Sequence, residues 1–239
     1  MTKKVINQNT NFKNELITTI EPQFIFTDKP INRFNVLNTG GDLEENNKVE
    51  LLQNLKKQIN SIENCKLREN SDKIILGEGN INSPLMLIGD APGAEEEKFG
   101  TPFEGEVGKL LNKMLIAINI KRENIYVSYS INFRPPDDRK PTSKEIKRYS
   151  IFIKEHITII DPKIIILMGS TAMEAVTGIN DKISLERGNW KEIILNNRTY
   201  PLIISFSPSY LIRFPENKKY SWEDLKKIKT KIEDLNIKV

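Results

Sequence analysis

Acidic side chains and the aromatic ring of Phe103 lie close together in residues 85–103. A short apolar run, Leu85 to Ile88, predicts a buried strand, and Asp90 opens a sharp turn directly after it. Glu95 to Glu97 and then Phe103 follow. This order of residues suits a pocket that holds a flat ring and places a carboxylate beside it. The alternative is a surface turn with solvated glutamates.

The elements that must position these residues alternate regularly. Helical patterns separate four apolar runs of strand length, at residues 85–88, 125–127, 164–168 and 202–206. Such alternation is typical of a parallel sheet with helices on both faces. The sequence therefore predicts an α/β fold with three layers, α/β/α, around a four-stranded and mostly parallel central sheet.

The helices of this domain are predicted from apolar stripes and caps. One follows Phe103, and a second begins at Thr142-Ser143, whose hydroxyls can cap it, and stops near Asp161-Pro162. A short helix follows Gly169, and the last runs from about Ser221 to Leu235. Residues 1–71 are predicted to form an irregular, partly helical leader, and residues 72–239 the main domain.

Composition excludes several classes of site. The chain has 239 residues, a net charge of +4, one cysteine and one histidine, so an internal disulfide and a histidine-built metal site are excluded. No apolar run approaches the roughly 18 residues that a membrane-spanning helix needs. The first residues lack the apolar core of a signal peptide. We expect a monomeric, cytoplasmic protein without a membrane partner, and its mildly basic charge is compatible with a phosphate-backbone partner.

The predicted topology indicates where chemistry takes place, because ligands of open α/β sheets bind beyond the carboxyl ends of the strands. The segments at those four ends are rich in turn formers, hydroxyls and charges: Asp90-Ala-Pro-Gly93, residues 129–139, Gly169-Ser-Thr171, and Ser207-Pro-Ser-Tyr-Leu-Ile-Arg213. We expect all four segments to line one cleft.

Several of these motifs, taken in order, resemble those of the uracil-DNA glycosylase superfamily, and most of all its family-four branch. They are Gly89-Asp-Ala-Pro-Gly93, Gly100-Thr-Pro-Phe103, Arg134-Pro-Pro, Pro162-Lys-Ile-Ile-Ile-Leu-Met-Gly169, Arg187-Gly-Asn-Trp190 and Ser207-Pro-Ser-Tyr-Leu-Ile-Arg213. The resemblance covers about residues 72–235. It implies a base-excision repair enzyme that flips uracil out of DNA and hydrolyses its N-glycosidic bond.

The resemblance also implies roles for single residues. Cleavage develops positive charge on the sugar and negative charge on the leaving base, so a carboxylate near the sugar and a donor near the base are both useful. The implied catalytic residues are Asp90, Ser207 and Glu96. The implied base-binding residues are Ala91 and Gly93 through their amides, Phe103 as the stacking ring, and Tyr129. The implied DNA-binding residues are Ser209, Leu211 as a minor-groove wedge, and Arg213 as a phosphate contact.

Three positions depart from the family pattern. The family usually has glutamate where this chain has Asp90, asparagine where it has Tyr129, and histidine where it has Ser207. Aspartate is one methylene shorter, so a bridging water is expected. Tyrosine lacks the paired donor and acceptor of an amide and is large enough to fill the base pocket. Serine can donate a hydrogen bond but cannot carry positive charge.

The iron–sulfur cluster of the family-four branch is expected to be absent. By alignment, its four cysteines fall at Ile62, Cys65, Phe133 and Tyr149. One thiolate cannot replace the four that usually hold such a cluster. We expect apolar packing in its place and no cofactor.

Other interpretations stay open. Phe103 could simply pack against the helix that follows it. Lys218-Lys219 and Arg139-Lys140 could contact DNA or be solvated charge. Besides a uracil-DNA glycosylase, the chain could be a catalytically weakened DNA-binding homologue of the same fold, or a glycosylase for another deaminated base.

Overall fold

A computed structural model describes residues 41–71 and 73–239, which belong to one compact unit. The strands are β1 (Gly77–Gly79), β2 (Leu85–Gly89), β3 (Tyr126–Tyr129), β4 (Ile164–Met168), β5 (Trp190–Leu195) and β6 (Arg198–Ser205). The α-helices are α2 (Gly41–Asn60), α3 (Lys66–Glu69), α4 (Ala94–Phe99), α5 (Gly105–Ile116), α6 (Ser143–Ile160), α7 (Ser170–Thr177), α8 (Ile183–Glu186), α9 (Pro208–Arg213) and α10 (Lys218–Asp234). Short 3-10 turns are η1 (Arg122–Asn124), η2 (Pro136–Asp138) and η3 (Pro215–Asn217).

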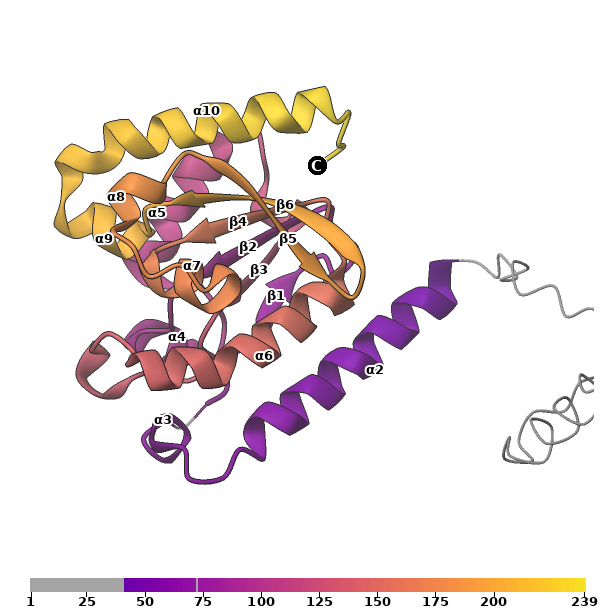
Figure 1. The fold of residues 1–239 in the computed structure, drawn as a ribbon, viewed down its shortest axis with the longest axis vertical. Helices are drawn as coiled ribbons and strands as arrows, with labels where there is room; N and C mark the ends of the chain where they lie inside the picture. The colour runs from indigo at the N-terminus through magenta and orange to yellow at the C-terminus, as the bar shows by residue number, and fades with distance from the viewer. Residues whose placement is uncertain (1–40, 72) are drawn as a thin grey trace, which may run out of the picture. The chain divides into compact units, whose positions relative to one another are not determined.

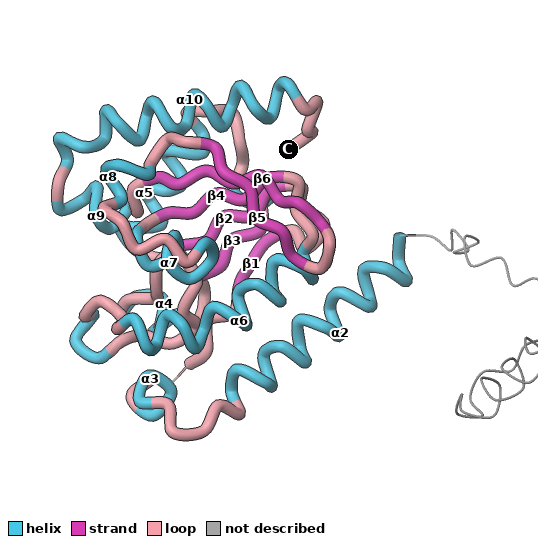
Figure 2. Tube along the Cα trace, in the orientation of Figure 1, coloured by secondary structure: helices cyan, strands magenta, loops and turns pink. Residues whose placement is uncertain are grey.

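The six strands form one sheet in the order β1-β3-β2-β4-β6-β5 (Figure 2). The four inner strands are parallel, whereas β1 and β5 pair antiparallel at the two edges. After β2 the chain adds β3 on one side of it and later β4 on the other. The strand order therefore reverses at β2, and the crevice beyond the carboxyl end of this strand is the expected ligand position.

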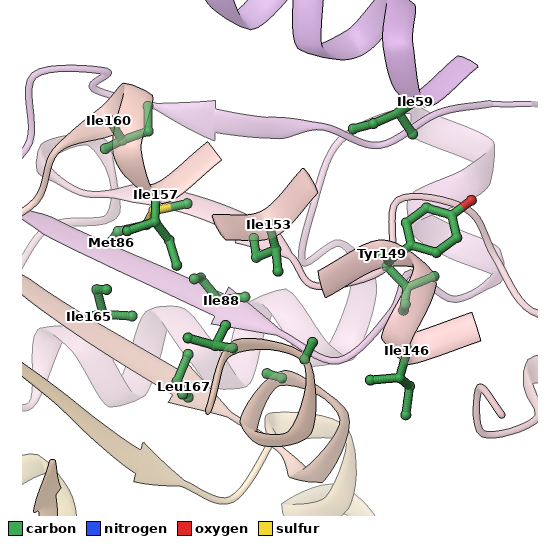
Figure 3. Packing of buried hydrophobic residues seen from close by; sticks show 14 of the residues in the cluster. Ile59, Met86, Ile88, Ile146, Tyr149, Ile153, Ile157, Ile160, Ile165 and Leu167 are labelled. Carbon is green, nitrogen blue, oxygen red and sulfur yellow. The ribbon is translucent and has the colours of Figure 1, made fainter. Parts of the chain in front are cut away.

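Alternate side chains of the inner strands enter two different cores. In β2, Leu85 and Leu87 pack with α5 and α10, whereas Met86 and Ile88 pack with α2, α6 and α7. Figure 3 shows the second core, where Ile153 and Ile157 of α6 lie over the sheet residues Met86 and Ile88. Helices thus cover both faces of the sheet, as Figure 1 shows, and the sheet is held rigidly between them.

The predicted α/β fold and its parallel strands are confirmed, with two corrections. Within residues 41–71 and 73–239 the sheet has six strands and not four, because the antiparallel edge strands β1 and β5 escaped the prediction. The short apolar run Ile74–Leu76, ahead of the turn at Gly77, also suggests a strand in the sequence, but the strand β1 begins only at Gly77. Helix α6 begins as predicted, with Thr142 as its cap and Glu145 completing a capping box.

The predicted boundary after residue 71 does not coincide with an edge of the compact unit. Leu55 and Ile59 of α2 are buried in the core that α6 and the sheet share. Residues 1–40, the first part of the predicted leader, lie outside the described residues. No helix within the described ranges is long and apolar enough to cross a membrane.

Candidate active site

A cleft of about 540 Å³ lies at the carboxyl ends of the parallel strands. All four of the loops expected there contribute to its wall, although they are far apart in the sequence. Nearly all of the predicted site residues line it: Asp90, Ala91, Gly93, Glu96, Phe103, Tyr129, Ser207, Ser209 and Arg213. Leu211 is the exception. The reversal of strand order at β2 explains why these loops converge beside Asp90.

Asp90 follows β2 directly and is held by the amino end of α7. Its Oδ1 accepts hydrogen bonds from the backbone N–H groups of Thr171, at 2.7 Å, and Ala172, at 3.0 Å. Burial raises the pKa of the Asp90 carboxyl from 3.8 to about 6, although the two amide bonds oppose this shift. Within the described residues Oδ2 has no hydrogen-bond partner. One oxygen is thus anchored while the other is available in a cleft.

Gly169 makes the close approach between Asp90 and α7 possible. Its φ of +117° lies in a region that side chains rarely adopt. A Cβ at this position would come within 2.0 Å of Asp90 Oδ2. The glycine that precedes α7 therefore leaves space for the carboxylate.

Tyr129 and Phe103 form the aromatic side of the cleft. Their rings stack with centroids 4.7 Å apart and an interplanar angle of 28°. Only 2% of Phe103 and 4% of Tyr129 is exposed. A Cβ at Gly89 would come within 2.7 Å of both rings, so this glycine lets the pair lie against the end of β2. Each ring covers one face of the other.

Glu96 ties this aromatic pair to the acidic turn. Its Oε1 accepts hydrogen bonds from Tyr129 Oη, at 3.1 Å, and from the backbone N–H of Glu104, at 3.2 Å. Its Oε2 accepts from the backbone N–H of Gly93, at 2.9 Å. Tyr129 Oη in turn accepts from the N–H of Phe103, at 3.1 Å. Glu96 is 4% exposed and organises the loop, and the Gly93 amide that was expected to hold a base is already bonded to it.

Ser207 lies at the opposite wall as the cap of α9. Its Oγ accepts a hydrogen bond from the N–H of Tyr210, at 3.3 Å, and lies 3.1 Å from Ser209 Oγ. Arg213 also lines the cleft, and its positive charge lowers the pKa of Asp90. At the rim, Arg139 is bonded to Glu145 of α6, at 2.8 Å, whereas Lys140 acts on Asp90 through its charge.

Leu211, the residue implied as a minor-groove wedge, does not lie at the surface. Leu211 is 1% exposed and belongs to the core beneath α9. The neighbouring Ile212 and Phe214 are 41% and 44% exposed. The turn of α9 points Leu211 inward and these two side chains outward.

Comparison with known proteins adds a decisive observation to this geometry. Residues 76–228 match the uracil DNA glycosylase superfamily. The chain belongs to this superfamily. The matched range contains β2, the acidic turn, the Tyr129 strand and the loop from Ser207 to Arg213, which are the segments that build the cleft.

Several type-4 uracil-DNA glycosylases align with most of the chain. The type-4 uracil-DNA glycosylase of Thermotoga maritima is 33% identical over 184 residues, which are 76% of this chain and 94% of that protein. The type-4 enzyme of Archaeoglobus fulgidus is 28% identical over 75% of this chain and 92% of its own length. That of Sulfurisphaera tokodaii is 30% identical over 76% and 84%.

The residues at the expected cluster positions do not fit an iron–sulfur cluster. Ile62, Cys65, Phe133 and Tyr149 are all buried in one apolar core. Cys65 Sγ lies 3.4 Å from Tyr149 Oη, and the rings of Phe133 and Tyr149 meet edge to face at 6.5 Å. The whole chain has one cysteine, whereas four thiolates usually hold such a cluster. Within the described residues there is also no group of three or more histidine, cysteine, aspartate or glutamate side chains that could hold a metal ion.

Two aromatic residues of this glycosylase cleft were missed from the sequence. Phe206 and Tyr210 both line the cleft, with ring centroids 4.9 Å apart. The Tyr210 ring is also tilted against that of Phe214, with centroids 4.9 Å apart. The spacing of four residues between aromatic side chains was the available signal, because residues i and i+4 lie on one face of a helix.

Proposed function

We propose that this protein excises uracil from DNA by hydrolysing the N-glycosidic bond. The observation that carries the proposal is the Asp90 carboxylate, anchored through one oxygen at the amino end of α7 and facing a cleft built from the superfamily's motifs. A cleft of about 540 Å³ has room for a flipped nucleotide and a water molecule together.

Asp90 is the proposed general base. A pKa of about 6 leaves the carboxyl mostly ionised at neutral pH and close to the value at which proton transfer is efficient. With Oδ1 anchored, Oδ2 positions the water that attacks the sugar, and the negative charge stabilises the cationic sugar of the transition state. Since aspartate is shorter than the glutamate common in the family, a second water is proposed to bridge the gap.

The departing base receives less help on its side of the cleft. Ser207 Oγ can donate its hydrogen to a uracil oxygen when it is not directed to Ser209. A hydroxyl provides no positive charge, and removal of a single oxyanion donor in other enzymes lowers the rate about 10²- to 10³-fold. We therefore propose slow excision. Lys140 and Arg213, at and within the cleft, are proposed to contact DNA phosphates, and the protein is proposed to act as a cytoplasmic monomer.

The direct test is an excision assay with uracil-containing oligonucleotides. The wild type should release uracil and leave an alkali-labile abasic site. Asp90→Asn should keep the two amide bonds through its side-chain oxygen yet lower the rate about 10²- to 10⁴-fold. The exposed Glu95→Gln is the matched control from the same segment. Equal rates for Asp90→Asn and wild type would exclude Asp90 as the base.

A second function is favoured by the aromatic pair. Because Tyr129 stacks on Phe103 and is fixed through its hydroxyl, the ring that would hold a uracil is already covered. A protein with this arrangement could bind DNA without excising uracil, or act on another deaminated base. Tyr129→Asn should uncover Phe103 and raise the rate of uracil release if the ring limits it. An unchanged rate would argue against occlusion, and substrates with hypoxanthine or xanthine test the other bases.

A further inference from the structure

An aromatic column runs beside the cleft and ends at the surface. We use this name for Tyr220, Phe206, Tyr210 and Phe214, together with the Arg187 guanidinium, which lies 5.4 Å from the Tyr220 ring centroid and 5.7 Å from that of Phe206. Phe206 stacks on Tyr210 at an interplanar angle of 25°, and Tyr210 is tilted against Phe214 at 39°, each pair with ring centroids 4.9 Å apart. The column thus joins the wall of the cleft to the outer surface of α9 and η3.

The inner part of the column is rigid. Arg187 donates from Nε to Asp224 Oδ2 at 3.0 Å, and its terminal nitrogen bonds Asp224 Oδ1 and the Tyr220 carbonyl oxygen. Asp224 is fully buried. Phe206 is 4% exposed, so its ring is held between its neighbours and the core.

The outer end is open to solvent, and its backbone is held by one hydrogen bond. Phe214 is 44% exposed, and its N–H donates to the Tyr210 carbonyl oxygen at 2.9 Å. Pro215 follows and restricts its backbone. Within the described part of the chain, Tyr210 is the only aromatic ring against Phe214, and the two rings are tilted by 39°. The other face of the Phe214 ring is therefore an exposed apolar plane that Tyr210 supports from one side, and such support lowers the entropic cost of binding.

Three basic residues lie within five positions of Phe214 in the sequence. Arg213, Lys218 and Lys219 are exposed, and none of them forms a salt bridge within the described ranges. Glu216 is the single carboxylate between residues 212 and 220. Arg213 reaches from this surface to the cleft, whose wall it helps to form. A polyanion with planar groups fits such a surface, and nucleic acid has both features.

We propose that Phe214 is a stacking platform for an unpaired base of the DNA strand that leaves the cleft, so that the protein binds single-stranded DNA more tightly than duplex. The proposal rests on the proposed function, since it takes DNA as the ligand. In a duplex both faces of a base are covered by its neighbours, whereas an unpaired base can place one face on Phe214 while Arg213, Lys218 and Lys219 hold its phosphates. The partially buried Tyr210 supports the platform from behind.

The exposed side chains allow a different role, in which Ile212 and Phe214 are wedges that enter a duplex. A wedge needs apolar bulk, whereas a platform needs a flat ring. Substitution of Phe214 by leucine separates these two roles, because leucine keeps the bulk and loses the plane.

The test measures dissociation constants by fluorescence anisotropy with uracil-free DNA, as a single strand of about 15 nucleotides of mixed sequence and as the matching duplex. Phe214→Ala and Phe214→Leu should each weaken single-strand binding about 5- to 150-fold and change duplex binding by about twofold or less. Phe214→Trp should bind the single strand at least as tightly as the wild type. Phe99→Ala, at another exposed phenylalanine outside the cleft, is the control and should bind like the wild type.

Several outcomes overturn the platform. They are wild-type affinity in Phe214→Leu, a loss on duplex as large as on the single strand, and a wild type that binds no single-stranded DNA. Tighter binding to an RNA strand of the same sequence would reassign the ligand to RNA. Thermal unfolding of each variant checks the fold, and Phe214→Leu decides the matter if Phe214→Ala does not fold. Because these strands lack uracil, normal single-strand binding without uracil release would overturn the proposed excision and leave the platform intact.

Discussion

The two walls of the cleft differ in how much of their chemistry is open to a ligand. On the wall at α7, one oxygen of Asp90 is anchored by two amides and the other is available. On the wall at β3, Tyr129 and Phe103 use each other's ring faces, and Glu96 closes the hydrogen bonds behind them. The hydrolytic wall is therefore prepared for a substrate, while the base-recognition wall is filled by its own side chains.

This difference indicates that the two tasks of a glycosylase can be altered separately. Activation of water depends on local geometry at the ends of β2 and β4, which Gly169 and the amides of α7 maintain. Recognition of a base depends on an uncovered ring face for stacking and on a hydrogen-bond donor for the edge of the base. Tyr129 covers the face of Phe103, and its own hydroxyl is bonded to Glu96. Four predictions test whether the walls are independent.

Gly169→Ala should have the largest effect, because it changes the hydrolytic wall directly. The new Cβ would overlap Asp90 Oδ2 and would also require φ of +117°. We expect a loss of about 3 kcal/mol or more in the free energy of unfolding, and a large loss of uracil release. Urea unfolding measures the first and the oligonucleotide assay the second.

Gly178→Ala is the matched control for this substitution. Gly178 also has positive φ, +77°, but no atom of the described residues lies within 4 Å of the Cβ it would gain. It should lose only about 1 kcal/mol, from backbone strain alone. Equal losses for the two variants would show that strain, and not contact with Asp90, explains the glycine at position 169.

The hydrolytic wall with Asp90 could be predicted from the sequence more fully than the base-recognition wall with Tyr129 and Phe103. The apolar run before Asp90 and the alternation of strands and helices are local signals, so they placed Asp90 at a strand end next to a cleft. The stack of Phe103 on Tyr129 joins residues 26 positions apart and depends on how β3 pairs with β2. No local pattern contains that information, although the size of tyrosine suggested a filled pocket.

The other failures of prediction also have local causes. Strand β5 is half exposed and pairs only with β6, so it lacked the continuous apolar run of the inner strands, although Asn196 and Asn197, both with positive φ, form a turn typical of a hairpin. Leu211 and Ile212 are adjacent apolar residues, and only the phase of α9 decides which one faces the core.

Asp90→Asn should raise the free energy of unfolding, by less than Gly169→Ala lowers it. Because burial raises the Asp90 pKa from 3.8 to about 6, the folded state binds this proton more tightly than the unfolded state does. Wild-type stability should therefore fall as the pH rises from about 4 to about 6 and then stay level with respect to this group. The variant should match the wild type near pH 4 and exceed it by about 1–3 kcal/mol above pH 6. A variant that is less stable than the wild type at pH 7 would contradict this burial cost.

The rate of uracil release should depend on pH through the ionisation of Asp90. Asp90 acts as a base only when ionised, so uracil release should be level above pH 7 and fall about tenfold for each pH unit below about 6. The measurement is single-turnover release between pH 4.5 and 8, with circular dichroism to confirm the fold at each pH. A rate that stays level down to pH 4.5 would indicate an aspartate with an ordinary pKa and an open, solvated wall.

Tyr129→Phe should have the smallest effect, and it tests the base-recognition wall alone. It keeps the stack on Phe103 but removes the hydroxyl that bonds Glu96 and the Phe103 amide, which leaves two buried polar groups with fewer partners. We expect a loss of about 1–2 kcal/mol in the free energy of unfolding and a rate of uracil release within about threefold of the wild type. Tyr129→Asn provides the contrast, since it removes the ring as well. If Tyr129→Phe raised uracil release as much as Tyr129→Asn, the hydroxyl and its bond to Glu96 would be what keeps the wall closed, and the ring would be able to move aside once released.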